Sequence, residues 1–191
     1  MGGARRFIAP SWSEIEELAA DVAEEVLMDG FRPDVVVGVL RGGVVAAKLV
    51  ADYLGVGRLA VFEVKFYRGI GEHGEEPVVT QPLVERVQGL RVLLVDDVVD
   101  TGKTLALATS YVSMHGPREV RSASLYVKPW ASVKPDYYGE ETDAWIIFPW
   151  ERMEAVRELL AGGGFTLEEA AELAGVDPGR AERLLRLREV R

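Results

Sequence analysis

The sequence predicts an α/β protein with a mainly parallel, doubly wound sheet and a small helical appendix after it. Short runs of apolar, β-branched residues, typical of strands buried on both faces, alternate with segments whose apolar residues recur at helical spacing. This alternation favours right-handed β-α-β units, and the turns that follow two of the strands carry glycine. The predicted strands cover residues 34–39, 59–64, 91–95, 120–127 and 145–148.

The first helices have clear boundary signals. Ser11 and Glu14 form a capping-box pair that predicts the start of a helix, and Gly30 predicts its end. After the first strand, the sequence predicts a helix over 44–54 that Gly55 closes.

The middle of the chain contains the clearest strand, at 91–95, and a helix predicted over 103–114 follows it. Residues 65–89 interrupt the alternation, and the first part of this segment, 65–77, is rich in glycine and charge. Long irregular segments in compact domains are usually lids or binding loops, and a solvated hairpin is the alternative.

The character of the sequence changes near its end, so we expect a main domain at 1–151 and a three-helix appendix at 152–191. Thr166 and Glu169 form a second capping-box pair within the appendix. Because so short a segment cannot carry a large core of its own, we expect it to dock on the main domain or on a partner.

Composition excludes several classes of protein. The chain has 191 residues, of which 48% are hydrophobic, and this is enough to bury a core and to exclude a disordered chain. The net charge of −9 disfavours non-specific nucleic-acid binding by the whole molecule. There is no cysteine, which excludes disulfides, thiolate metal sites and cysteine nucleophiles.

No apolar run approaches the ~18–20 residues that cross a bilayer, and the first residues lack an apolar stretch of signal-peptide length. We therefore expect a cytoplasmic protein with no membrane contact. The only histidines, His73 and His115, cannot make a histidine-rich metal site alone. The absence of asparagine beside abundant glutamate and arginine indicates a hot habitat.

The strongest functional signal follows the strand at 91–95. Small and hydroxyl residues from Asp100 to Thr104 open a helix, where backbone N–H groups and the helix dipole favour a phosphate. Thr101 and Thr104 add hydroxyl donors, and Gly102 lets the backbone approach a ligand closely.

An acid pair, Asp96 and Asp97, precedes this loop. Although Gly102, Lys103 and Thr104 match the end of a nucleotide-triphosphatase P-loop, Asp97 stands where that motif needs glycine. Carboxylates suit ribose hydroxyls or a divalent metal, so the combination predicts a phosphorylated ribose as ligand. The alternative is a surface acid cluster beside an ordinary helix cap.

A second glycine turn, Arg41-Gly42-Gly43, follows the first strand. Its backbone amides and the guanidinium fork suit a pyrophosphate, although such turns often only reverse the chain. Ligands of parallel sheets bind at the carboxyl ends of the strands, where both turns are predicted.

Residues 93–102, Leu-Leu-Val-Asp-Asp-Val-Val-Asp-Thr-Gly, resemble the phosphoribosyl-pyrophosphate (PRPP) signature of type I phosphoribosyltransferases. The resemblance covers residues 8–151 and implies that Asp96 and Asp97 meet the ribose hydroxyls and help to hold Mg²⁺. It also implies that the loop from Asp100 to Thr104 holds the 5′-phosphate. By the same resemblance, Arg41-Gly42-Gly43 is the pyrophosphate loop, and a cis peptide precedes Arg41.

The same resemblance makes residues 65–82 a lid or hood that closes over the reaction centre, with Lys65, Tyr67 and Arg68 as its contacts. Lys128 and Trp145 end neighbouring predicted strands, where an ammonium group and an aromatic face could clamp a purine.

The arrangement around Lys128 and Trp145 resembles the xanthine–guanine (6-oxopurine) branch of the family. There the lysine meets the 6-oxo group and the Trp145-Ile146 pair holds the base, with Glu151 near the exocyclic group at position 2. We expect Phe148, in contrast, to pack in the core.

The implied reaction converts a purine and PRPP into a nucleoside monophosphate and pyrophosphate in a homodimeric, Mg²⁺-dependent enzyme. Arg41 stabilises the leaving group, and Asp100 takes or steers the proton on purine N7. The alternative role of Asp100 is to cap the following helix. Because Lys128 seeks an acceptor where adenine carries an amino donor, the pattern favours guanine, xanthine or hypoxanthine.

The alternative function is a transcription regulator that senses PRPP or a purine on the same fold. It is motivated by a resemblance of residues 167–191 to a helix-turn-helix unit, whose last helix could grip nucleic-acid phosphates. Its arginines are Arg180, Arg183, Arg186, Arg188 and Arg191. The favoured interpretation of this segment is an amphipathic pair that packs Leu184, Leu185 and Leu187 on the body or on a second subunit.

Overall fold

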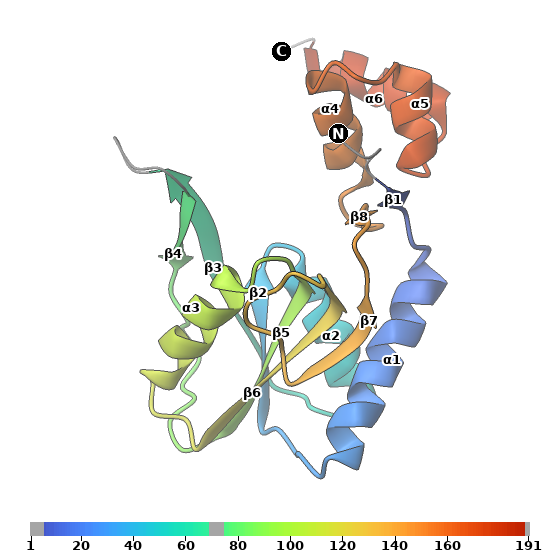
Figure 1. The fold of residues 1–191 in the computed structure, drawn as a ribbon. Coiled ribbons are helices and arrows are strands. Elements are labelled where there is room, and N and C mark those ends of the chain that lie inside the picture. Colours follow the sequence, from blue (N-terminus) through green and yellow to red (C-terminus); the bar gives the residue numbers. More distant parts are fainter. Residues whose placement is uncertain (1–5, 69–74, 190–191) are drawn as a thin grey trace. The chain divides into compact units, whose positions relative to one another are not determined.

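A computed structural model describes residues 6–68 and 75–189 (Figure 1). The chain divides into two compact units. One comprises Ile15–Thr142, and the other joins the described residues up to Glu14 with those from Asp143 onward. Within the described residues, no helix is long and apolar enough to cross a membrane.

The larger unit contains a six-stranded sheet in the order β4-β3-β2-β5-β6-β7, in which only β4 runs antiparallel to its neighbour. The predicted mainly parallel α/β fold is thereby confirmed. The strands are β2 (Val35–Leu40), β3 (Leu59–Arg68), β4 (Glu75–Gln81), β5 (Arg91–Val99), β6 (Glu119–Val127) and β7 (Tyr137–Glu141).

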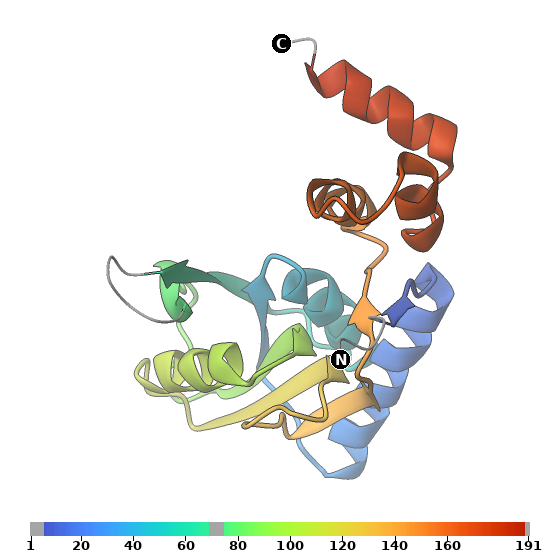
Figure 2. The same cartoon turned by 45° about the horizontal axis from the view of Figure 1, so that its top comes forward.

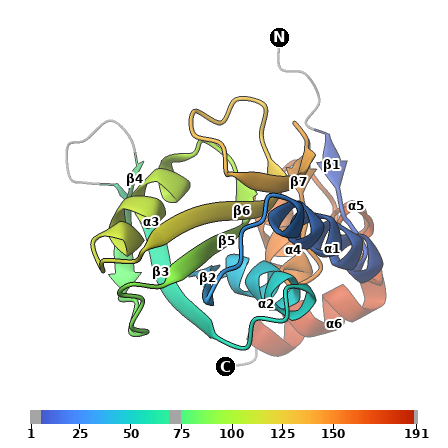
Figure 3. The ribbon, with the colours of Figure 1, turned by 90° about the horizontal axis from the view of Figure 1, so that it is seen from below.

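Helices cover both faces of this sheet: α3 lies on one face, and α1 and α2 lie on the other (Figure 3). The helices are α1 (Trp12–Met28), whose first turn belongs to the smaller unit, α2 (Gly43–Tyr53) and α3 (Lys103–Ser113). Valines of β2 and leucines of β5 are fully buried, as expected for central strands of a doubly wound sheet. Gly38 in β2 lets α2 approach, because a Cβ there would lie 2.9 Å from the Cβ of Ala47.

Residues 65–82 form ordered strand over much of their length, and this is the hairpin that stood as the alternative to an irregular lid. β3 continues to Arg68 and pairs with β4, with Phe66 opposite Pro77. Proline is tolerated there because β4 is an edge strand. The tip, residues 69–74 with His73, lies outside the described residues.

Other differences concern strand ends. β5 extends to Val99, so that Asp96 and Asp97 lie inside the strand rather than after it. The edge strand β7, with its tyrosines and glutamates, has no apolar run and was missed. The predicted strand at 145–148 is shorter, and the expectation that it neighbours the strand before Lys128 is wrong, because Trp145–Ile146 pairs with β1 (Phe7–Ile8) in a separate sheet.

The smaller unit contains a short parallel pair, β1 (Phe7–Ile8) with β8 (Trp145–Ile146), and three helices (Figure 2). The helices are α4 (Arg152–Ala161), α5 (Leu167–Leu173) and α6 (Pro178–Glu189). Both predicted capping boxes are present, at Ser11 with Glu14 and at Thr166 with Glu169.

Hydrogen bonds of Arg152 link distant parts of the chain within the smaller unit. The guanidinium of Arg152 donates to the carbonyls of Gly175 and Pro10, at 2.7 and 3.2 Å. The structure thus groups residues 143–151 with the helical appendix, whereas the boundary at 151 stays a prediction about domains.

Candidate functional site

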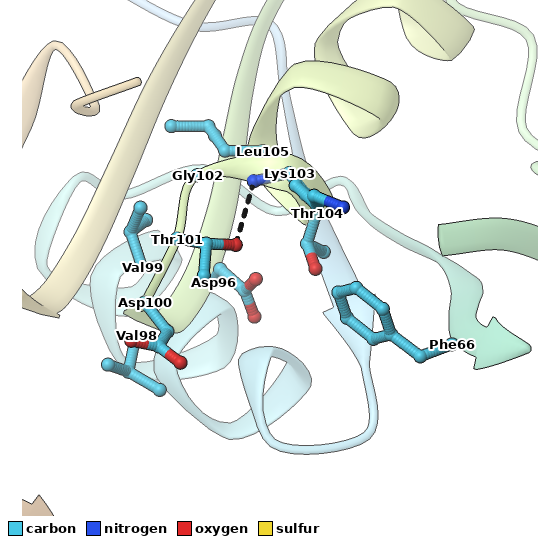
Figure 4. A pocket seen from close by; sticks show the side chains of 10 residues that line it. All are labelled: Phe66, Asp96, Val98, Val99, Asp100, Thr101, Gly102, Lys103, Thr104 and Leu105. Atoms are coloured by element: carbon cyan, nitrogen blue, oxygen red, sulfur yellow. Dashed lines mark hydrogen bonds between the residues drawn. The ribbon is translucent and has the colours of Figure 1, made fainter. Parts of the chain in front are cut away.

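A cavity of about 470 Å³ opens where β5 turns into α3 (Figure 4). Figure 4 shows the hydroxyl groups of Thr101 and Thr104 at this turn, with the Asp96 carboxylate in the strand beside it. The cavity brings together the acid pair's first member and the whole predicted phosphate loop. Its lining residues are Phe66, Asp96, Val98, Val99, Asp100, Thr101, Gly102, Lys103, Thr104 and Leu105.

The phosphate loop has the geometry of a backbone cradle. Gly102 occupies the N-cap position of α3 in the left-handed region, at φ +87°, so the cap residue itself has no side chain that could accept from the helix. Thr101 Oγ1 accepts from the Lys103 N–H at 3.4 Å. The alternative role of Asp100 as the cap of this helix is therefore wrong, because its carboxylate does not accept from the first turn of α3.

The acid pair is held in an unusual electrostatic state. Asp96 is only 8% exposed, and its Oδ1 accepts from the Asp97 N–H at 3.1 Å. Burial raises the pKa of the Asp96 carboxyl well above its usual range, and the neighbouring charge of Asp97 raises it further. A cation or hydroxyl donors beside the pair would relieve this destabilisation.

The turn 41–43 lies directly beside the acid pair. β2 and β5 are neighbours, and a Cβ on Gly43 would lie 2.7 Å from Asp96 Oδ1. Only glycine permits this approach without displacing the carboxylate. The peptide Leu40–Arg41 is cis, which confirms the expectation for this turn.

Glu63 is a buried carboxylate that sequence reasoning missed. It is 6% exposed and lies opposite Leu40 in the β2–β3 register. The Thr80 hydroxyl donates to the Glu63 carboxylate at 2.7 Å, and the Lys65 ammonium lies 2.9 Å from it. The hydrogen bond from Thr80 is the main reason why the pKa of Glu63 is lowered. A single acid in an apolar strand, between Phe62 and Val64, was the available signal.

Lys128 follows β6, the neighbour of β5, and is 7% exposed. Its N–H donates to the Val99 carbonyl at 2.9 Å, which ties the two strand ends together. Two residues further on, Trp130 Nε1 donates to Asp100 Oδ1 at 2.7 Å. Trp130 was also missed, since its only sequence signal was its place after the Lys-Pro pair.

The predicted lid residues lie on the β3–β4 hairpin. Lys65 forms the ion pair with Glu63, while Tyr67 and Arg68 pair through their backbones with β4. The hairpin also reaches the phosphate loop, because Lys103 Nζ lies 2.7 Å from Glu76 Oε1.

The remaining purine-site candidates belong to the smaller unit. Trp145 is 44% exposed and lines an apolar cavity with Phe7 and Phe165, whereas Ile146 is buried and Glu151 half-buried. Their role toward a base stays a prediction. The expectation that Phe148 belongs to the core is confirmed, since it is 2% exposed. Its ring stacks on that of Trp150, with 4.6 Å between the ring centroids.

Among residues 6–68 and 75–189, no group of three or more histidine, aspartate or glutamate side chains could hold a metal. Asp96 and Asp97 are the carboxylates that the sequence predicts as metal ligands, and a metal held by such a pair would take its other ligands from substrate and water. Mg²⁺ is commonly bound this way, by one or two carboxylates with substrate phosphates.

A parallel sheet with an acid pair, a glycine cradle and a cis turn at adjacent strand ends is the arrangement that the sequence predicts for a phosphorylated sugar. A family model described as the phosphoribosyl transferase domain matches residues 11–153. The chain belongs to the phosphoribosyltransferase family.

Curated relatives narrow the comparison within this family. The xanthine-guanine phosphoribosyltransferase of Cereibacter sphaeroides is 35% identical over 150 residues, covering 74% of this chain and 84% of that protein. The enzyme of the same name from Ruegeria sp. is 33% identical over 154 residues, covering 74% and 83%.

Solved structures agree with this placement. The purine phosphoribosyltransferase from Pyrococcus horikoshii Ot3 is 40% identical, with a TM-score of 0.68, covering 75% of this chain and 93% of that chain. A Neisseria gonorrhoeae protein solved with bound ppGpp has a TM-score of 0.72 at 22% identity, covering 91% and 98%, and this likeness shows the fold alone.

Proposed function

We propose that the protein transfers the 5-phosphoribosyl group of PRPP to a 6-oxopurine, giving a nucleoside monophosphate and pyrophosphate. The observation that carries the proposal is the meeting of three strand ends on neighbouring strands. The turn after β2, the acid pair and loop of β5 and the lysine after β6 offer complementary groups for pyrophosphate, phosphoribose and base. The relatives named above act, by their names, on xanthine, guanine or purines.

PRPP would bind across the β2 and β5 ends. The amides and hydroxyls from Asp100 to Thr104 suit the 5′-phosphate, because the N-terminus of a helix favours an anion. Asp96 and Asp97 accept hydrogen bonds from the ribose hydroxyls. The turn 41–43 supplies amides and the Arg41 guanidinium for the pyrophosphate.

We further propose Mg²⁺ as cofactor, held by Asp96 and Asp97 together with oxygens of PRPP. When bound, the ion would neutralise charge on the departing pyrophosphate. The support from this chain is the buried acid pair, in which burial and the neighbouring charge of Asp97 both disfavour the ionised form of Asp96.

In the reaction, the bond between ribose C1′ and the pyrophosphate oxygen breaks, and its electron pair leaves with pyrophosphate. Arg41 and the neighbouring amides stabilise the negative charge that develops there. The lone pair of purine N9 forms the new bond to C1′, and the proton on N7 passes to Asp100. Binding holds base and sugar in line, which supplies much of the acceleration.

Base selection follows from Lys128. Its ammonium donates to the 6-oxo group of guanine, xanthine or hypoxanthine, whereas adenine presents an amino donor at that position. Trp145 would stack on the base, Ile146 would bond it through the backbone and Glu151 would lie near position 2. Lys65, Tyr67 and Arg68 would act when the hairpin covers the site and excludes water.

We propose a homodimer, which the resemblance to the family supports, and a cytoplasmic location, which was expected from the sequence. The regulator alternative rests on the last helix alone, where five arginines outnumber Glu182 and Glu189. Residues 166–191 carry five arginines against six acidic residues, so this segment offers a polyanion no net positive charge.

Calorimetry of PRPP binding in the presence of Mg²⁺ tests the ligand part of the proposal. The wild type should bind, and the variant with both Asp96→Asn and Asp97→Asn should lose most of this affinity. The Asp52→Asn variant is the control, because Asp52 is an exposed acid that pairs with Lys48 on α2. Wild-type protein that ignores PRPP, or equal binding by the double variant, would contradict the proposal.

A further inference from the structure

Trp130 contacts both polar groups that the proposed mechanism directs at the purine. Its indole N–H donates to Asp100 Oδ1 at 2.7 Å, and the Lys128 ammonium lies 5.8 Å from the centroid of its ring. The second distance lies within the range in which a cation is attracted to an aromatic face. N7 and the 6-oxo group, the atoms assigned to Asp100 and Lys128, lie on the same edge of a 6-oxopurine.

The segment that carries Trp130 is built against the phosphate loop. Ser132 donates to the Thr101 carbonyl twice, from its N–H at 3.0 Å and from its hydroxyl at 2.7 Å. A Cβ on Gly102 would lie only 2.6 Å from the backbone nitrogen of Val133. Residues 130–133 thus lie alongside residues 100–102 and contact each of them.

The same segment is anchored at its start. The Ala131 N–H donates to the Lys128 carbonyl at 3.0 Å, which closes a turn directly after the lysine. Anchored at both ends, the indole is held at Asp100 although it is 55% exposed. Such preorganisation is what a catalytic carboxylate requires, because its orientation then needs no adjustment during the reaction.

We propose that Trp130 is a positioning residue for proton transfer. Its N–H occupies Oδ1 of Asp100 and directs Oδ2 toward purine N7, while its ring faces the ammonium of Lys128. Oδ2 accepts no hydrogen bond within residues 6–68 and 75–189 of the structure. The inference rests on the proposed function, since it assigns Trp130 a role through Asp100 rather than through PRPP.

The kinetic test compares Trp130→Phe with wild type. The variant keeps an aromatic ring and loses only the indole donor, so we expect kcat with guanine to fall about tenfold while the KM for PRPP stays within about twofold. Trp12→Phe is the matched control, because Trp12 is also 55% exposed but packs on Trp150 in the smaller unit. Thermal unfolding of both variants shows whether they are folded.

A double-mutant cycle distinguishes positioning from a purely structural role. If Trp130 acts through Asp100, adding Trp130→Phe to Asp100→Asn lowers kcat by no more than about twofold further. Equal kcat for Trp130→Phe and wild type, a loss confined to the KM for PRPP, or additive losses in the cycle would each overturn the inference.

An activity-free measurement separates this inference from the proposed function. In a ¹H–¹⁵N spectrum of the indole groups, the Trp130 signal, assigned by its absence in Trp130→Phe, should shift upfield in Asp100→Asn while the Trp12 signal stays in place. A Trp130 signal that does not move would show that its indole N–H does not contact Asp100, and would overturn the inference. Wild-type protein that turns over no purine would instead overturn the proposed function.

Discussion

Asp96 shows how one residue ties stability to ligand binding. Its carboxyl is buried beside Asp97, so the folded protein holds a proton on it more tightly than the unfolded chain does. A group whose folded-state pKa is raised stabilises the fold fully below its unfolded pKa of about 3.9. That contribution is lost as the pH rises through the raised folded-state pKa. The ligand-free protein is thus destabilised by a charge that the proposed substrate and metal would use.

Replacing Asp96 by asparagine should remove this dependence. In the absence of PRPP and Mg²⁺, Asp96→Asn should have a higher thermal midpoint than wild type at neutral pH, and the difference should shrink toward pH 4. Thermal unfolding at a series of pH values measures it. Asp52→Asn is the control, because Lys48 lowers the pKa of Asp52 and its contribution has the opposite sign. An Asp96→Asn curve parallel to wild type at every pH would contradict the electrostatic account.

Asp100, unlike the buried Asp96, is exposed, and it is not the cap of α3. Asp100→Asn should lower kcat about a hundredfold while leaving PRPP affinity within a fewfold, because it removes a proton acceptor and keeps the loop. Steady-state kinetics with guanine, together with calorimetry of PRPP, checks both values. If both stay near wild type, Asp100 does not handle the proton.

Among the elements, the loop between β5 and α3 depends most on one backbone position. Gly102→Ala places a side chain in the left-handed region, which costs about 1–2 kcal/mol, and drives its methyl group into the backbone of Val133. We expect the free energy of unfolding to fall by about 2 kcal/mol or more and PRPP binding to weaken. Denaturant unfolding measures the change.

Gly57→Ala provides the comparison for that measurement, because a methyl group on Gly57 would meet no atom within 4 Å and the residue has no positive φ. It should leave the free energy of unfolding within about 0.5 kcal/mol of wild type. Equal effects at Gly57 and Gly102 would show that the close approach of Val133 is unimportant.

The elements also show which parts of the fold and the site can be predicted from the sequence. β2 and β5 were predicted because each contains a continuous apolar run, and both capping boxes were predicted because they are local. β7 was missed, and β4 was expected only as part of an alternative hairpin, because edge strands carry polar residues and proline and β7 pairs with a neighbour distant in the chain. The acid pair, cradle and turn were predicted from residue type, whereas Glu63 and Trp130 emerge only from contacts across strands.

At the scale of the whole molecule, charge distinguishes the enzyme from the regulator. Because the chain carries −9 overall and residues 166–191 are not basic on balance, we expect no duplex-DNA shift in a gel at low salt. A salt-sensitive and sequence-selective shift would instead support the regulator and give α6 a role in binding. Repeating the gel with PRPP present tests whether a sensed ligand changes the outcome.

The most direct measurement is pyrophosphate release from PRPP and Mg²⁺ with five bases in turn: guanine, xanthine, hypoxanthine, adenine and uracil. If Lys128 donates to a 6-oxo group as proposed, one or more of the first three should release pyrophosphate and form the nucleotide, while adenine and uracil give at most background. No release with any purine, or adenine as the preferred base, would contradict the central claim that these strand ends join an activated phosphoribose to a 6-oxopurine.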